Sequence, residues 1–457
     1  MLFINSLRFV GGQNIGFALA LQLCIFAANA ADSDIIYQIV LSASNQQLLG
    51  SVCQNEITSK AFDLPENARW VGSEPFVDTA SGSSCIHYRK TLSSNKSTRY
   101  FDAAQHRGVT VSSLDAVLPC AKSTKRYRGR IQITLDKGAQ ASLPGKRVAT
   151  NEFELLDRPC GWSSVLVYGE IIERTLNFGE SKIRIAMPTA LSNEHQQKLM
   201  SWLNSGLNAL ALAYGSLPLP ETQLLIFPVG KNREAVPWGQ AMRGGGDAVH
   251  LYVDETKSLL ELNDDWVLVH ELSHLLHPYM MGADGWLSEG IASYYQNVLR
   301  ARSGLLTNIQ AWEKLDAGFQ RGEKQFTPGV RLYENTRNLM RQRQYMRVYW
   351  SGAAIALIGD VKLRQASGGN MSLDKLLKEI AACCLPTTRR RWQAKDLILR
   401  FDEISGTQIF SQLYNDYVMH AEFPTLSDIY EDLGVQRTNS GLRFNTGGEG
   451  LRDSIMN

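Results

Sequence analysis

A chain of 457 residues is too long for a single small module and has the size of two or three domains. Its apolar share of 44% and charged share of 20% are those of a folded globular protein, which excludes a disordered chain and a multi-span membrane protein. The 47 Lys and Arg residues almost balance the 45 Asp and Glu residues and leave a formal net charge of +2. This balance gives no sign of nucleic acid as a partner.

The first 30 residues have the features of a secretory leader. A single charge, Arg8, precedes an apolar run over residues 15–26, and an A-x-A sequence at 28–30 supplies a cleavage site. The run is shorter than the about 20 residues that a membrane-spanning helix needs. We expect residues 1–30 to be removed, no integral membrane segment to remain, and the protein to be exported, either to a periplasm or out of the cell. An uncleaved leader that acts as an anchor is the alternative.

Removal of the leader would take Cys24 and leave six of the seven cysteines. An even number of cysteines in an exported chain is typical of disulfide bonds. The adjacent Cys383 and Cys384 could bridge only through a strained peptide link, so their state stays open. The other four cysteines favour two local pairings: Cys53 with Cys85, and Cys120 with Cys160.

Along the rest of the chain, the pattern of apolar and polar residues changes twice. Residues 31–177 consist of short alternating runs separated by Gly, Ser, Asn and Pro, which predicts a strand-rich amino-terminal domain. Residues 178–351 mix both patterns, and residues 352–457 are mainly helical in pattern. The sequence therefore predicts an α+β fold. The elements expected at the start of the second region are a strand at 183–187, a long helical segment that opens at 192–194 and stops at Gly215, and a strand at 224–227.

Chemistry-bearing residues are concentrated in the segment 266–277, which contains His270-Glu271-x-x-His274. Four residues apart on a helix, the two imidazoles lie one above the other and can both reach one metal ion. Glu271 lies about 100° further round the helix, where its carboxylate can receive a proton from metal-bound water. The opposite side of this helix carries residues that would face the core: Leu268, Leu272 and Leu275.

A second helix supplies a third candidate ligand. The chain turns after Pro278, and the helix that starts at Trp286 carries Glu289. Two imidazoles and one carboxylate, with the fourth position open to water, are the ligands of a catalytic zinc ion. We expect one zinc per chain, bound by His270, His274 and Glu289, with Glu271 as general base and acid. His277 is the rival third ligand, but three ligands from one helix end would be cramped, so we expect it behind the ligands or at the rim.

At this point the residues resemble a known family. His270-Glu271-x-x-His274, followed by Trp286-Leu287-Ser288-Glu289-Gly290, resembles the gluzincin zinc metallopeptidases, and among them the glycyl aminopeptidase family and its aminopeptidase-N-like relatives. Residues 349–354 and 360–369 resemble a further segment of that family. The resemblance implies a thermolysin-like catalytic domain over residues 178–351 and hydrolysis of peptide or protein substrates. It also implies that Tyr349 stabilises the oxyanion of the transition state. Three other tyrosines are alternates for this role: Tyr345, Tyr294 and Tyr295.

The segment 240–253 resembles the Gly-rich loop and the strand that line the substrate site in these families. The resemblance assigns substrate contacts to four residues: Gly245, Gly246, Asp247 and His250. Relatives that remove amino-terminal residues hold the substrate's free amine with an acid in this segment, and the nearest acid here, Asp247, lies out of pattern. The choice between trimming ends and cutting internally therefore stays open. About 30 residues follow Thr425, and we expect no carboxy-terminal PDZ domain of the kind that glycyl aminopeptidases carry.

The sequence thus predicts an exported, zinc-dependent metallopeptidase. The alternative is a gluzincin-fold protein that is catalytically inactive or directed at a non-peptide substrate and acts in binding. The intact Glu271 argues against a relic that keeps only the fold, because such a protein has no need of that carboxylate. Hydrolysis of a non-peptide amide would use the same residues.

Overall fold

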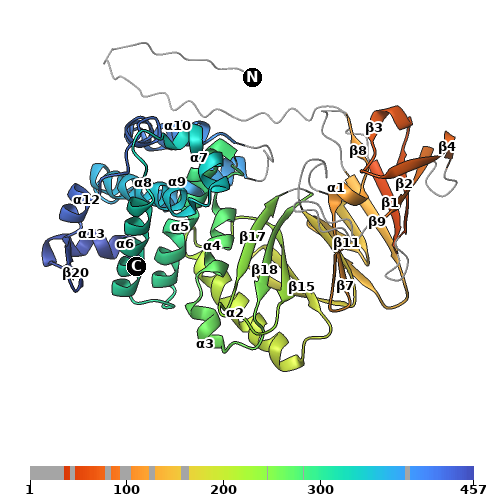
Figure 1. Cartoon of the computed structure of the whole chain (residues 1–457), viewed down its shortest axis with the longest axis horizontal. Coiled ribbons are helices and arrows are strands. Elements are labelled where there is room, and N and C mark those ends of the chain that lie inside the picture. The colour runs from red at the N-terminus through yellow and green to blue at the C-terminus, as the bar shows by residue number, and fades with distance from the viewer. Residues whose placement is uncertain are drawn as a thin grey trace, which may run out of the picture. The chain divides into compact units, whose positions relative to one another are not determined.

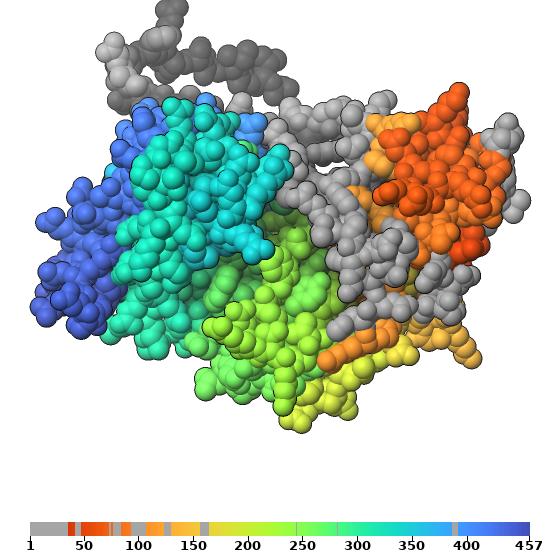
Figure 2. Space-filling model, in the orientation of Figure 1, coloured from red at the N-terminus to blue at the C-terminus, as the bar shows by residue number. Residues whose placement is uncertain are grey.

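The computed structural model describes residues 35–41, 47–77, 84–92, 104–122, 129–155, 164–243, 245–280, 282–385 and 392–457. The predicted leader lies outside the described residues. Figure 1 shows strands in the amino-terminal part of the described chain, a central sheet, and helices toward the carboxy terminus. On the surface in Figure 2, yellow and green residues lie between the orange residues of the amino-terminal part and the cyan and blue residues toward the carboxy terminus. The predicted α+β class, with a strand-rich amino-terminal region and a helical carboxy-terminal part, is confirmed.

Two antiparallel-rich sheets form the amino-terminal region. A seven-stranded sheet has the order β11-β12-β9-β1-β2-β5-β4, and a four-stranded sheet has the order β10-β13-β7-β6. Apolar residues alternate along these strands, and in β1 every second side chain is buried in the core between them. The elements are β1 (Ile35–Leu41), β2 (Gln47–Gln54), β3 (Phe62–Asp63), β4 (Ala68–Val77), β5 (Ser84–Thr91), β6 (Ala104–His106), β7 (Val109–Ser113), α1 (Leu114–Val117), β8 (Cys120–Ala121), β9 (Gly129–Leu135), β10 (Gln140–Ser142), β11 (Lys146–Ala149), β12 (Glu152–Leu155) and β13 (Val165–Gly169).

Two disulfide bonds join described cysteines. Cys53 on β2 is bonded to Cys85, which lies directly opposite on β5, as predicted. Cys383 is bonded to its neighbour Cys384 at the end of a helix, which answers the question that the sequence left open. The other predicted pairing involves Cys160, which lies outside the described residues.

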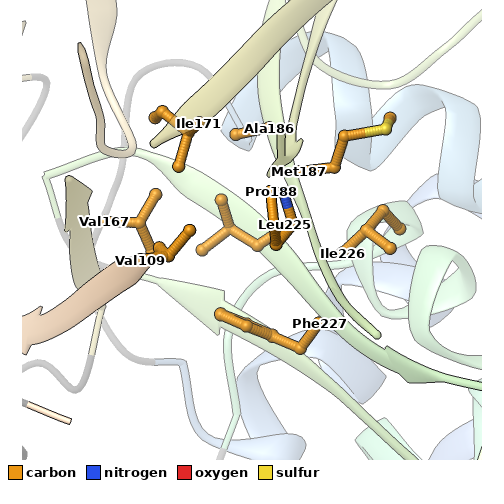
Figure 3. A pocket seen from close by; sticks show the side chains of 9 residues that line it. All are labelled: Val109, Val167, Ile171, Ala186, Met187, Pro188, Leu225, Ile226 and Phe227. Atoms are coloured by element: carbon orange, nitrogen blue, oxygen red, sulfur yellow. The ribbon is translucent and has the colours of Figure 1, made fainter. Parts of the chain in front are cut away.

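The central sheet has five strands in the order β14-β15-β16-β18-β17. One face packs against helices, since Val249, Leu251 and Val253 of β18 share a core with Leu268 of the helix α4. The other face packs against the four-stranded sheet. A small pocket between these two sheets, shown in Figure 3, is lined only by apolar residues: Val109, Val167, Ile171, Ala186, Met187, Pro188, Leu225, Ile226 and Phe227. The elements are β14 (Ile171–Phe178), β15 (Ser181–Pro188), α2 (Asn193–Ala211), β16 (Glu221–Pro228), β17 (Trp238–Arg243), β18 (Asp247–Val253), α3 (Leu259–Asp264) and α4 (Val267–Ser273).

The remaining residues are mostly helical and pack around two long helices, α5 (Gly285–Arg302) and α8 (Tyr345–Ala366). A short hairpin of β19 and β20 interrupts the helical pattern that the sequence predicts for this part. Among the described residues, no helix has the length and apolar character that crossing a membrane requires. The other elements are α6 (Asn308–Lys324), α7 (Leu332–Arg341), α9 (Leu373–Cys384), α10 (Ala394–Ser405), α11 (Ile409–Leu413), α12 (Ser427–Asp432), β19 (Val435–Thr438), β20 (Gly441–Phe444) and α13 (Glu449–Met456).

Buried charges connect the amino-terminal strands to the central sheet. Glu173 on β14 accepts hydrogen bonds from Arg147 on β11 and Arg184 on β15. The guanidinium group of Arg184 also donates to the carbonyl oxygens of Leu143 and Gly145. Burial raises the pKa of Glu173, but the hydrogen bond from Arg147 and the charges of the two arginines lower it more, so that the net pKa is below its ordinary value.

We predict that Glu173→Gln destabilises the protein at neutral pH by about 2 kcal/mol, because it removes a counter-charge from the buried guanidinium group of Arg184 and from the half-buried one of Arg147. The folded-state pKa of Glu173 lies below its unfolded value, so its contribution is complete above the unfolded value of about 4.3 and is lost as the pH falls through the folded value. Urea unfolding at pH 7 and at pH 3.5 measures both effects, and the variant should differ less from the wild type at the lower pH.

The control is Glu152→Gln, which removes the partner of Arg130 in a pair whose arginine is 53% exposed. Solvent screens such a pair, so the expected loss is below about 1 kcal/mol. Equal losses for the two variants, or a loss at Glu173 that does not depend on pH, would contradict the assignment.

Candidate metal centre

The candidate metal centre is built on two helices. α4 continues into a short 3-10 turn, η2 (His274–Leu276), and α5 begins at Gly285. Leu268 and Leu272 on one side of α4 are 2% and 0% exposed and pack into the core. The other side presents His270 and His274, whose ring centroids are 5.0 Å apart. The double pattern of α4, one side for the core and one for the histidines, is therefore present in the fold.

Three side chains converge between these helices. His270, His274 and Glu289 each offer one ligand atom, and the three atoms lie within 4.8 Å of one another. The Nε2 atoms of His270 and His274 are 3.3 and 3.6 Å from Oε2 of Glu289. Ligand atoms that bind one tetrahedral zinc ion are about 3.3 Å apart, because each bond is about 2.0–2.1 Å long. The donor types and their spacing fit zinc.

The charges of this site are strongly coupled. Burial raises the pKa of Glu289, but the charge of His274 and the hydrogen bond to His270 lower it more, so the carboxyl group is ionised. Burial lowers the pKa of His270, but the hydrogen bond to Glu289 and the charges of Glu271 and Glu289 raise it more. Two buried carboxylates thus make the site attractive to positive charge, which a bound cation would satisfy.

Glu271 lies beside the three converging side chains, and a hydrogen bond from β17 holds its carboxylate in place. Its Oε2 accepts a 2.8 Å hydrogen bond from the backbone N–H of Ala241 on β17. β17 approaches α4 closely at Gly239, where a Cβ atom would lie 2.6 Å from Cγ of Glu271. Burial raises the pKa of Glu271; the charges of His270 and His274 lower it and that of Glu289 raises it, with a raised net value. A carboxylate with a raised pKa accepts a proton more readily.

Tyr349 reaches the same site from α8. Its ring stacks on the ring of His270 at 5.8 Å with an interplanar angle of 14°. Burial, the charges of Glu289 and Glu271, and a hydrogen bond to Glu289 raise the pKa of Tyr349, so the phenol keeps its proton. The structure therefore brings together the five residues that the sequence predicts for ligands and catalysis: His270, Glu271, His274, Glu289 and Tyr349.

The alternate tyrosines point elsewhere. The hydroxyl of Tyr294 donates to Asp360, and that of Tyr295 donates to Asp374. Tyr345 lies at the rim, 41% exposed, with its ring edge-on to Tyr349 at 6.5 Å. Trp266 lies on the other side of the site, 43% exposed, with its ring 5.2 Å from His270. Two exposed aromatic rings thus border the converging residues.

The position of Tyr349 depends on a close crossing of α5 and α8. A Cβ atom at Gly290 would lie 2.3 Å from the carbonyl carbon of Gly352, and one at Gly352 would lie 2.1 Å from the carbonyl oxygen of Trp286. Only glycine fits at such a contact between backbones. Glu289 immediately precedes Gly290, and Tyr349 lies about one helical turn before Gly352, so the crossing sets the two side chains side by side.

The four predicted substrate residues lie in different surroundings. Gly245 and Gly246 belong to the turn between β17 and β18, and a Cβ atom at Gly246 would lie 2.3 Å from the backbone nitrogen of Gly145. Asp247 is 4% exposed and paired with Arg243. His250 is buried on the β18 face that is turned away from α4, and its ring lies edge-on to Phe227. The structure does not bring His250 together with the histidines of α4.

His277 is buried but is not one of the converging three. Its Nδ1 lies 2.8 Å from the carbonyl oxygen of Pro278, and its Nε2 lies 3.5 Å from Oγ of Ser288. Burial and the charge of His274 lower the pKa of His277 to about 3, so the ring is neutral. These contacts place it behind the candidate ligands, which is the secondary position that the sequence analysis expects.

Sequence reasoning missed three residues that support the site. Oε1 of Gln296 accepts a 2.8 Å hydrogen bond from Nδ1 of His270, and Ser288 lies 3.1 Å from Nδ1 of His274. Arg243 donates to the carbonyl oxygens of His274 and His277 at the end of η2. Gln296 was detectable, because it follows Glu289 by seven residues, or two helical turns, and so shares its face. The contact of Arg243 pairs a strand with a distant helix, for which the sequence carries no signal.

We predict that Gly352→Ala pushes α5 and α8 apart, lowers stability by about 1–3 kcal/mol and weakens metal binding, because Tyr349 and Glu289 lose their alignment. Thermal unfolding and zinc titration of the purified protein measure the two effects. The control, Gly285→Ala, adds a methyl group to α5 with its nearest neighbour 3.8 Å away, and it should bind zinc like the wild type. Unchanged stability and zinc binding in Gly352→Ala would contradict the role of the crossing.

Comparison with known proteins agrees with this geometry. The family model of the M61 glycyl aminopeptidases matches residues 267–354, which run from α4 through Tyr349 and Gly352. No curated protein sequence matches the chain. An aminopeptidase N family protein from Idiomarina loihiensis is 15% identical with a TM-score of 0.65, and the alignment covers 88% of this chain and 78% of that one.

An M1 zinc metallopeptidase from Deinococcus radiodurans is 16% identical with a TM-score of 0.55, covering 86% of this chain and 94% of that one. A Glu-to-Ala variant of an M1 zinc metallopeptidase from the same organism, bound to a Tyr-Ser-Ala substrate, is 17% identical with a TM-score of 0.54 and the same coverage. At these identities the likeness establishes the fold. The chain thus has the fold of the M1 zinc metallopeptidases, and across its candidate metal centre it matches the family model of the M61 glycyl aminopeptidases.

Proposed function

We propose that the protein is a zinc-dependent peptidase that binds one zinc ion per chain through His270, His274 and Glu289. The observation that carries the proposal is the convergence of these three ligand atoms within 4.8 Å, with Glu271 beside them and Tyr349 opposite. When bound, zinc would supply a Lewis acid that polarises a carbonyl group and lowers the pKa of a water molecule. The match to a peptidase family over the same helices supports this function.

The proposed role of Glu271 is to take a proton from the attacking water and return it to the leaving amine. The hydrogen bond from Ala241 fixes one carboxylate oxygen, which leaves the other oxygen for the proton. The raised pKa of Glu271, which follows mainly from burial, suits a group that must hold this proton for part of the cycle. Tyr349 keeps its phenolic proton and donates it as a hydrogen bond to the carbonyl oxygen of the scissile bond as charge develops there.

The surroundings of the site suit a peptide. β17 is an edge strand whose second edge pairs with no strand among the described residues, so an extended substrate backbone can add to it. Gly239 and Ala241 of this strand lie next to Glu271, which brings such a backbone to the catalytic residues. The exposed rings of Trp266 and Tyr345 offer apolar contacts to substrate side chains.

We propose further that cleavage does not require a free amino terminus. Asp247 is the acid closest in sequence to the predicted amine-binding segment, and it is buried and paired with Arg243. Arg243 in turn donates to carbonyl oxygens at the end of η2. The charge of Asp247 is therefore used within the fold, and its geometry favours support of the site over recognition of a substrate amine.

The site of action is proposed to lie outside the cytoplasm. The leader over residues 1–30 is the basis for this proposal. The disulfide bond between Cys53 and Cys85 supports it, because disulfides persist in oxidising compartments. The same argument covers a periplasm and the extracellular space.

We predict that Glu271→Gln binds zinc as the wild type does but loses at least about 100-fold in cleavage rate, because the general base is removed and the ligands are kept. Glu289→Ala should lose zinc. Mass spectrometry of a mixed peptide library after incubation with each protein measures cleavage, and elemental analysis measures zinc. The control is Glu431→Gln, which changes an exposed glutamate on α12. Unchanged cleavage by Glu271→Gln, or stoichiometric zinc in Glu289→Ala, would refute the assigned roles.

We also predict that acetylation of a substrate's amino terminus changes kcat/KM by less than about tenfold, which corresponds to 1.4 kcal/mol. An enzyme that holds the amine with a buried carboxylate would lose more, since that carboxylate would be left unpaired. The measurement compares free and acetylated forms of the same peptides and identifies the fragments. Release of single residues from free peptides only would show that the protein is a strict aminopeptidase.

A further inference from the structure

A chain of hydrogen bonds runs behind His274, on the side away from the candidate ligand atoms. Nδ1 of His274 lies 3.1 Å from Oγ of Ser288, which lies 3.5 Å from Nε2 of His277. Nδ1 of His277 lies 2.8 Å from the carbonyl oxygen of Pro278. Ser288 and His277 are 7% and 1% exposed, so bulk water does not compete for these contacts.

The chain has only one consistent direction. The carbonyl oxygen of Pro278 can only accept, so His277 carries its proton on Nδ1 and its Nε2 is an acceptor. Ser288 therefore donates its single hydroxyl proton to His277. The oxygen of Ser288 then has lone pairs left, and it accepts the proton on Nδ1 of His274. In the neutral imidazole this leaves Nε2 of His274 without a proton, and Nε2 is the atom that lies 3.6 Å from Glu289.

For the other candidate histidine ligand, His270, a single residue fixes which ring nitrogen carries the proton. Nδ1 of His270 lies 2.8 Å from Oε1 of Gln296. An amide oxygen only accepts, so His270 also carries a proton on Nδ1, and its Nε2 is the nitrogen that faces Glu289 at 3.3 Å. Both imidazoles thus turn the nitrogen that can bind a metal toward Glu289, but the two supports differ, because a serine hydroxyl can donate as well as accept.

We propose that His277 and Ser288 form a relay that holds His274 in the tautomer with Nε2 free for the metal. His277 is needed because it consumes the one proton that Ser288 could otherwise donate to Nδ1 of His274. If Ser288 donated there, His274 would carry its proton on Nε2, where it blocks a metal ion. Ser288 and His277 are positioning residues, and the inference rests on the proposed function only in that zinc is bound.

The test uses the mature full-length protein and zinc itself as the probe, with a chromogenic chelator as competitor. Ser288→Ala removes the acceptor, and His277→Leu frees the serine proton. Each should weaken zinc binding by about 10–100-fold. Ser288→Thr keeps the hydroxyl group and should bind within about threefold of the wild type. The control is Ser273→Ala, a buried serine of α4 whose hydroxyl donates only to the carbonyl oxygen of Val269, and it should also bind like the wild type.

A second readout separates tautomer control from a general loss of structure. Nitrogen-15 NMR of histidine-labelled, zinc-free protein distinguishes a protonated Nδ1 from a protonated Nε2. The wild type should show His274 with its proton on Nδ1, whereas His277→Leu should shift His274 toward the Nε2 form. A change in thermal stability alone moves neither this signal nor the zinc affinity of correctly folded protein.

The outcomes are distinct. Wild-type zinc affinity and an unchanged His274 tautomer in both Ser288→Ala and His277→Leu would overturn the relay and leave the proposed function intact. Absence of zinc binding by the wild type would overturn the proposed function and the relay with it. If Ser288→Ala does not fold, His277→Leu decides the question by the same two measurements.

Discussion

The contact between the backbones of α5 and α8 at Gly290 and Gly352 is the constraint on which the candidate site depends. It leaves no room for a side chain, so the two helices cross at a fixed distance. Glu289 and Tyr349 lie beside this crossing on separate helices, and α4 supplies the histidines. Sixty-three residues separate Tyr349 from Trp286, yet the crossing places the tyrosine against His270. The close contact of these two glycines thereby helps to bring three separate stretches of chain together into one site, which contains the candidate ligands, Glu271 and Tyr349.

The two carboxylates of this arrangement differ in their environments and hence in their proposed roles. Glu289 faces both imidazoles and has a lowered pKa, whereas Glu271 is buried against β17 and has a raised one. A site that pushes the pKa values of two acids apart assigns one of them to charge and the other to proton transfer. The separation arises from neighbours: Oε2 of Glu289 lies 3.3 and 3.6 Å from two imidazole nitrogens, whereas Glu271 accepts a hydrogen bond from a neutral backbone amide.

Local patterns in the sequence were enough to predict the helix of His270 and His274, its core side and the acid on the following helix, because helical spacing alone relates these residues. The bridge between Cys53 and Cys85 was likewise predictable from a short separation. The hydrogen bonds of Arg243 to the carbonyl oxygens of His274 and His277, the backbone contact of Gly246 and the hydrogen bonds of Ser288 were not predictable. They join elements whose register is set by packing of the whole core. His250 shows the same limit, because the alternation of side chains along a strand does not say which face of β18 the helix α4 would cover.

Among the described residues, the amino-terminal strands supply no candidate ligand, yet a short series of contacts connects them to Glu271. Arg184 holds the carbonyl oxygens of Leu143 and Gly145, and Gly145 lies directly against Gly246 in the turn between β17 and β18. That turn fixes the end of β17, and the N–H of Ala241 on β17 holds Glu271. Burial of the charged group Arg184 among fixed carbonyl oxygens makes the first contact rigid, and the glycine pair makes the second one close. The orientation of the proposed general base therefore depends on the strand-rich region, which packs with the central sheet in one compact unit.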